Sequence, residues 1–281
     1  MSTARQRVIA YIVLVAAFAI AAHYAAPKIG GGASAFVVMW TPALAALAAS
    51  VLTRRSFGAI DWRLWPVKWL AAGWIIPSLY AFPAYALVWL AGLGSVPSST
   101  FLERARITLG MPSEANWLVI VSAFGYIALV NLLPNVILTL GEELGWRGFL
   151  VPELTTWVGF RRASLCSGLI WAAWHLPGIL TGTYGGSGTP KAYQLVCFTA
   201  LAIASAVVMA WLRMRSRSVW PSTIMHATHN GIIQAFFNRI TADTGPTAWF
   251  IGEFGIALVP FTVAVAWYCW RHPPRLDATH A

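Results

Sequence analysis

Long apolar runs separated by short polar connections make up most of the chain. A transmembrane helix needs about 20 mostly apolar residues. The prolines within these runs are tolerable, because neighbouring helices can satisfy the backbone groups that they free. We therefore expect an all-α fold, a polytopic membrane helix bundle with about eight transmembrane helices. The expected spans are Val8–Ala26, Ala33–Leu52, Trp69–Leu93, Trp117–Leu140, Ala163–Leu180, Ala192–Leu212, Val219–Phe237 and Ala248–Trp270.

The composition supports a membrane setting. Of 281 residues, 58% are hydrophobic and only 10% are charged, whereas about a quarter of the residues of soluble domains are charged. We expect one membrane-embedded domain over residues 1–281, with a catalytic core at about 117–240. Arg5 and Arg7 precede the first apolar run, which is long enough to span, so we interpret it as a retained helix rather than a cleaved signal peptide.

The basic residues fall mainly on one side of this arrangement, which predicts that both termini are cytoplasmic. Their gathering in short loops, despite a net charge of +10, favours membrane topology over a nucleic-acid surface. The expected cytoplasmic set is Arg5, Arg7, Arg54, Arg55, Arg63, Lys68, Arg147, Arg161, Arg162, Arg213, Arg215, Arg217, Arg271 and Arg275. The opposite set is Lys28, Arg104, Arg106, Lys191 and Arg239.

The segment from Trp117 to Arg161 is too long for one crossing, and two crossings would reverse the charge bias of every later loop. We therefore expect one crossing, followed by a second helical piece at the cytoplasmic interface or dipping back into the protein. The sequence NLLPN at residues 131–135 predicts a kink between the two pieces.

Ionisable residues within spans are costly and usually face the bundle interior or a wet cavity. Glu143 and Arg147 are four residues apart in the favourable order for an ion pair on one helix face. Glu142 points about 100° away and cannot share this arginine equally well. We expect the Glu143–Arg147 pair to brace the helix and Glu142 to be free for chemistry. The alternative is that both acids mark an exposed helix end.

Histidines occur in two further apolar runs. His175 lies four residues after Trp171, and taken alone it is typical of a satisfied core residue. His226 and Asn230 share a helix face, and we interpret the nearby His229 as a polar neighbour rather than a participant. The three cysteines, Cys166, Cys197 and Cys269, lie in apolar runs and are expected to be buried small hydrophobes.

Together these motifs resemble the CPBP family of intramembrane proteases, which includes CAAX prenyl endopeptidases and bacterial bacteriocin-processing and immunity (ABI) proteins. The matching elements are Glu142-Glu143-Leu-Gly-Trp-Arg147, Trp171-Ala-Ala-Trp-His175 and His226-Ala-Thr-His-Asn230. Many members carry Phe where this chain has Trp171, a departure from which we expect little chemical consequence. The short loops favour a bacterial member in the cytoplasmic membrane, acting on a peptide or membrane-protein substrate.

The resemblance implies that Glu142 and His175 activate water, with His226 and Asn230 as the oxyanion hole. A metalloprotease is the alternative, with Glu142, His175 and His226 as zinc ligands and Glu143 as the base. The familiar HExxH motif is absent, so we favour glutamate-activated water without an obligatory metal. Two other classes stay open: a proton-coupled transporter, and a catalytically silent immunity or scaffold protein.

Overall fold

The structure, a computed structural model, describes residues 2–56, 60–64 and 66–275. In these residues the chain is all-helical, with one isolated β-bridge between Ser95 and Ala242. The first half contains α1 (Ala4–Ile29), α2 (Gly31–Thr53), α3 (Val67–Leu90), α4 (Ser99–Leu109), α5 (Asn116–Gly125), η2 (Tyr126–Val130), α6 (Leu132–Glu143), η3 (Leu144–Leu150) and α7 (Val151–Val158). The second half contains α8 (Phe160–Thr181), α9 (Lys191–Ser216), α10 (Trp220–His229), η4 (Asn230–Phe237), α11 (Asn238–Ile240), η5 (Thr247–Trp249) and α12 (Leu258–Arg271).

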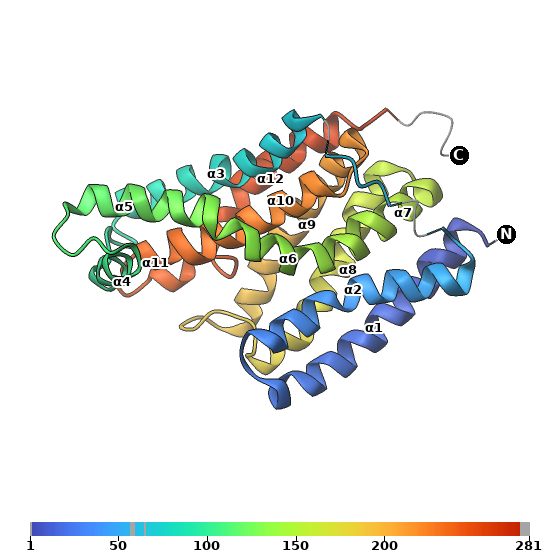
Figure 1. Ribbon diagram of the computed structural model, residues 1–281, viewed down its shortest axis with the longest axis horizontal. Helices are drawn as coiled ribbons and strands as arrows, with labels where there is room; N and C mark the ends of the chain where they lie inside the picture. The colour runs from blue at the N-terminus through green and yellow to red at the C-terminus, as the bar shows by residue number, and fades with distance from the viewer. Residues whose placement is uncertain (1, 57–59, 65, 276–281) are drawn as a thin grey trace.

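Helices α1 and α2 form a hairpin along one side of the bundle (Figure 1). Thr3 caps the start of α1 in a reciprocal capping box with Gln6. Gly30 and Gly31 join the two helices with φ values of 70° and 56°, a left-handed conformation that glycine adopts without steric cost. The tight turn therefore makes the two helices antiparallel neighbours.

The described residues contain five helices that are long and apolar enough to cross a membrane, or six if one bent pair counts as a single span. The integral membrane assignment therefore holds, but the expected number of eight is not confirmed. The bent pair, Asn116–Val130 and Leu132–Val158, meets at 42°. This break at Asn131 confirms the predicted kink in NLLPN.

The C-terminal part differs most from the expected spans. Residues 220–237 are helical, but the last expected span, Ala248–Trp270, is not one helix, since α12 begins only at Leu258. The chain before α12 turns through Gly252, whose φ is 73°, and buries the side chain of Glu253. A buried carboxylate needs several hydrogen-bond donors, and an irregular segment that reaches the bundle interior brings it to them.

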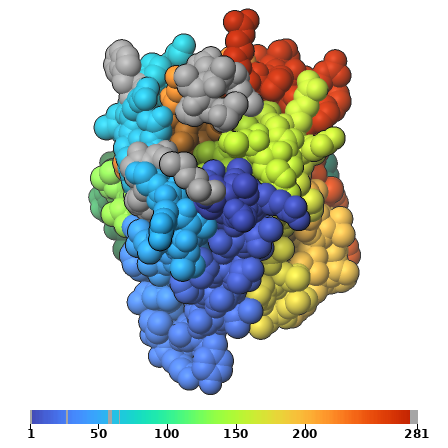
Figure 2. All heavy atoms as spheres, turned by 90° about the vertical axis from the view of Figure 1, so that its right-hand side faces the viewer, coloured from blue at the N-terminus to red at the C-terminus, as the bar shows by residue number. Residues whose placement is uncertain are grey.

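The start of α1 and the end of α12 lie at the same end of the bundle (Figure 1). There Glu153 of α7 binds Arg7 at 2.7 Å and Arg55 at 2.6 Å. Figure 2 views this end and shows the start of α1 against the yellow-green surface of the α7 region. Among the cysteines, Cys197 and Cys269 are buried as expected, whereas Cys166 is exposed. A thiol on an outward face of the membrane helix α8 is compatible with lipid, because it behaves as a small hydrophobe.

Close packing between α3 and α10 gives a stability prediction. A Cβ atom added at Gly73 would lie 2.3 Å from the backbone oxygen of Pro221, whereas one added at Gly32 would meet nothing within 4 Å. We expect Gly73→Ala to destabilise the protein by about 1–3 kcal/mol, because it forces α10 away from α3. Thermal unfolding in detergent measures this, with Gly32→Ala as the control. Equal unfolding temperatures for the two variants would contradict the close contact.

Candidate active site

The acidic motif lies at the point where α6 gives way to the π-helical turn η3. Such π-helical turns are rare and frequently occur at functional sites. Glu142 is 2% exposed, and Glu143 and Arg147 are fully buried. The alternative of an exposed helix end is therefore wrong.

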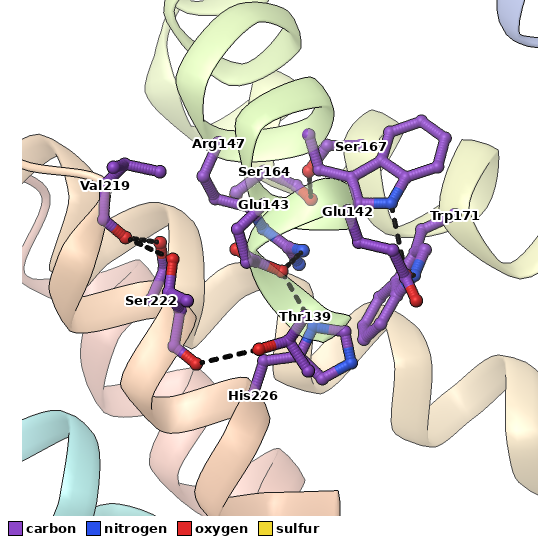
Figure 3. Close-up of polar contacts among 12 residues, drawn as sticks. Thr139, Glu142, Glu143, Arg147, Ser164, Ser167, Trp171, Val219, Ser222 and His226 are labelled. Carbon is purple, nitrogen blue, oxygen red and sulfur yellow. Dashed lines mark hydrogen bonds and ion pairs between the residues drawn. The ribbon is translucent and has the colours of Figure 1, made fainter. Parts of the chain in front are cut away.

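The ion pair expected between Glu143 and Arg147 is present. The Arg147 Nη1 atom lies 2.7 Å from Glu143 Oε1, and its guanidinium carbon lies 4.7 Å from the centre of the Trp171 ring. The same Glu143 oxygen accepts a hydrogen bond from His226 Nδ1 at 3.0 Å (Figure 3). Glu143 thus ties its own arginine to the histidine of α10.

Glu142 points away from this ion pair. Its Oε2 atom accepts a hydrogen bond from Trp171 Nε1 at 2.8 Å (Figure 3). The same atom accepts a longer hydrogen bond from Trp146 Nε1 at 3.4 Å. Its Oε1 atom has no hydrogen-bond partner among the described side chains. One oxygen is therefore held in place and the other is available to a ligand.

His175 is held by its own helix. Its Nδ1 atom lies 3.0 Å from the backbone oxygen of Trp171. A carbonyl oxygen can only accept, so Nδ1 carries a proton, and in the neutral ring Nε2 presents a lone pair. The ring packs against Trp174, Tyr184 and Phe198.

His226 and Asn230 follow one another on α10 and the first residue of η4. Because Glu143 accepts from His226 Nδ1, His226 Nε2 is the ring nitrogen that remains for other contacts. The side chain of Asn230 makes no hydrogen bond to any other described residue.

A cavity of about 650 Å³ brings these residues together. Glu142, His175, His226 and Asn230 all line it, whereas Glu143 and Arg147 do not and lie behind its wall. The remaining wall is largely apolar, with side chains from α1, α2, α6 and α9. The cavity can therefore hold a chain segment next to a carboxylate, two imidazoles and an amide.

A second buried carboxylate, absent from the sequence-based prediction, lines the same cavity. Glu253 Oε1 lies 3.0 Å from His229 Nε2, and Glu253 Oε2 accepts from Tyr184 Oη at 2.6 Å and from Gln234 Nε2 at 3.1 Å. His229 is thus a partner of Glu253, a role that its spacing from His226 did not indicate.

The expectation about Trp171 was wrong. A phenylalanine would have no donor for Glu142, whereas the Trp171 indole makes the shorter of the two hydrogen bonds to this carboxylate. The substitution at this position therefore changes how the acid is held. The sequence contained the indole, but the spacing of 29 residues between Trp171 and Glu142 gave no sign that they meet.

The alternative zinc ligands do not form a metal site. Within the described ranges, no group of three or more His, Cys, Asp or Glu side chains is placed to hold a metal ion. Glu142, His175 and His226 therefore do not fit a three-ligand zinc centre, and we derive no step through a metal.

Comparison with known proteins supports the same family as the motifs. Residues 123–232 match the family described as "Type II CAAX prenyl endopeptidase Rce1-like", and a comparison with curated proteins found no match. The matched segment contains Glu142, Glu143, Arg147, His175, His226 and Asn230, and leaves Glu253 outside. Residues 123–232 of the chain are thus similar to the Rce1-like family of CAAX-type proteases.

Proposed function

We propose that the protein is an intramembrane endopeptidase that hydrolyses a peptide bond with water activated by Glu142 and His175. The observation that carries this proposal is the single cavity lined by Glu142, His175, His226 and Asn230. Peptide hydrolysis needs a base for water, donors for the oxyanion and a proton for the leaving amine. These four side chains can meet all three needs.

Glu142 is the general base. Its free Oε1 atom accepts a proton from water, while the indole hydrogen bonds keep Oε2 in place. His175 Nε2 accepts a second hydrogen bond from the same water and orients it. The hydroxide attacks the carbonyl carbon, and the proton taken up by the Glu142–His175 pair passes to the leaving nitrogen as the C–N bond breaks.

His226 and Asn230 stabilise the oxyanion. The Asn230 amide donates through its NH₂ group, and His226 donates through Nε2 when its ring is protonated. The Glu143 carboxylate faces His226 Nδ1 and favours that protonated form, because an opposite charge at hydrogen-bond distance stabilises it. Donors that are already in place stabilise the developing negative charge more than water molecules do, because they need no reorganisation during the reaction.

The location also belongs to this proposal. The end with the start of α1, the end of α12 and the ion pairs of Arg7 and Arg55 with Glu153 faces the cytoplasm, in line with the excess of basic residues in its loops. The membrane is the cytoplasmic membrane of a bacterium, and the substrate is a peptide or the exposed segment of a membrane protein.

Metal removal tests the glutamate-dependent reaction. Purified protein in detergent, dialysed against a chelator and checked for metal content, is offered a peptide library, and the products are identified by mass spectrometry. We expect cleavage to persist at the untreated rate. Loss of cleavage on chelation with recovery on adding zinc would contradict the mechanism. If the protein cleaves no peptide before or after treatment, but carries ions across the membrane of liposomes, the result would favour the transporter.

A further inference from the structure

The cavity has a second polar region around Glu253, beyond the residues that the proposed reaction uses. Glu253 is 8% exposed, and its neighbours come from separate parts of the chain: Tyr184 follows α8, His229 ends α10, and Gln234 lies in η4. An irregular segment before α12 carries the carboxylate to this point. Donors from several segments thus surround the carboxylate and hold it at the cavity wall.

Hydrogen bonding around His229 indicates that its ring is neutral. His229 Nδ1 lies 2.6 Å from Tyr80 Oη, and Nε2 lies 3.0 Å from Glu253. The carboxylate can only accept, so Nε2 carries the proton. With Nδ1 unprotonated, the Tyr80 hydroxyl donates to it and every proton has an acceptor. A protonated ring would leave the hydroxyl hydrogen of buried Tyr80 without one.

The negative charge of Glu253 therefore has three neutral donors and no cationic partner. Glu142 is in the same position, since its two donors are indoles, and Arg147 pairs with Glu143 behind the wall. No Lys or Arg is among the described residues that line the cavity. A largely apolar cavity with two carboxylates that have no Lys or Arg partner attracts positive charge, because buried charges are normally paired.

Glu253 also retains one site for a ligand. A carboxylate offers about four lone-pair positions, of which His229 uses one on Oε1, and Tyr184 and Gln234 use two on Oε2. The remaining position on Oε1 can accept an ammonium or guanidinium N–H from the cavity.

We propose that Glu253 is a specificity-determining residue that binds a Lys or Arg side chain of the peptide substrate. This inference rests on the proposed function, which it deepens by naming the substrate class as basic peptides. The His175 ring contacts both Trp171, which donates to Glu142, and Tyr184, which donates to Glu253. The bound cation and the scissile bond thus lie on either side of His175, so the basic residue is within a few positions of the cleaved bond.

Matched peptides test the proposal. A single Lys is moved through each position of an acetylated, amidated hexapeptide of Ala and Leu, and the same set is made with norleucine, which keeps the chain but lacks the charge. For the wild type we expect kcat/KM to favour Lys over norleucine at least tenfold at one position. In Glu253→Gln the ratio falls to near one. Glu103→Gln, the same change on the exposed face of α4, keeps the wild-type ratio.

A binding measurement separates this inference from the proposed reaction. Fluorescent forms of the same peptides are titrated into Glu142→Gln, with and without Glu253→Gln. If the Lys peptide binds more tightly than the norleucine peptide, and Glu253→Gln removes this difference, the result supports the cation site. This holds even if the wild type cleaves no peptide, which would contradict only the proposed protease activity. An unchanged Lys-to-norleucine ratio in folded Glu253→Gln, in cleavage and in binding, would overturn the proposal.

Discussion

Glu142→Gln is expected to lower kcat about 10³-fold or more, because a positioned general base contributes roughly 10²–10⁴-fold to such reactions. The amide has the shape of the carboxylate and still offers an oxygen to the Trp171 indole, but it cannot take a proton from water. The variant should therefore fold, with an unfolding temperature close to that of the wild type. Steady-state cleavage of a peptide identified from the library measures the loss.

Glu103→Gln is the matched control for this variant, since it removes the same charge from an exposed helix face. It should retain the wild-type rate. A folded Glu142→Gln variant that cleaves as fast as this control would exclude Glu142 as the base, whatever the activity of the other site variants.

Arg147→Ala is expected to have the largest effect on stability. Removing one partner of a buried ion pair costs about 3–5 kcal/mol, because the other charge remains buried without compensation. Here the remaining charge is Glu143, which is fully buried. The Trp171 ring, which lies against the guanidinium, also loses its support. The unfolding temperature in detergent should fall by roughly 10 °C, because each kcal/mol of lost stability shifts it by about 2–4 °C in a chain of this size.

Two further variants show whether the ion pair is the cause. Arg162→Ala removes an arginine that is exposed at the start of α8 and should unfold near the wild-type temperature. Arg147→Met combined with Glu143→Gln removes both charges and should recover much of the loss. If the unfolding temperature of the double variant were no higher than that of Arg147→Ala, the buried charge would not be the source of the instability.

The sequence predicted contacts within a helix well. The spacing of Glu143 and Arg147 indicated an ion pair that forms at 2.7 Å, and the proline in NLLPN indicated the break that bends the chain by 42°. Both follow from the geometry of one helix. The roles of Glu142, His175, His226 and Asn230 stay predictions, although all four line one cavity.

Contacts between distant segments could not be predicted in this way. Glu253 lies 24 residues from His229 and 69 from Tyr184 along the chain. The sequence around it was interpreted as the apolar span Ala248–Trp270. Nothing in the local pattern shows that the chain leaves the helical path there to bury a carboxylate. The expected number of eight spans is not confirmed, since five or six helices of the described residues pass as spans. Hydropathy does not distinguish lipid-facing helices from segments that fill the protein interior.

Isotope incorporation tests the central claim most directly, that Glu142 activates water for peptide hydrolysis in the cavity. Purified, metal-depleted wild-type protein is incubated with its peptide in ¹⁸O-labelled water beside Glu142→Gln, and the new carboxyl terminus is analysed by mass spectrometry. We predict one ¹⁸O atom in the wild-type product at first turnover and no product above background from Glu142→Gln. Labelled product from the folded variant at the wild-type rate would contradict the account.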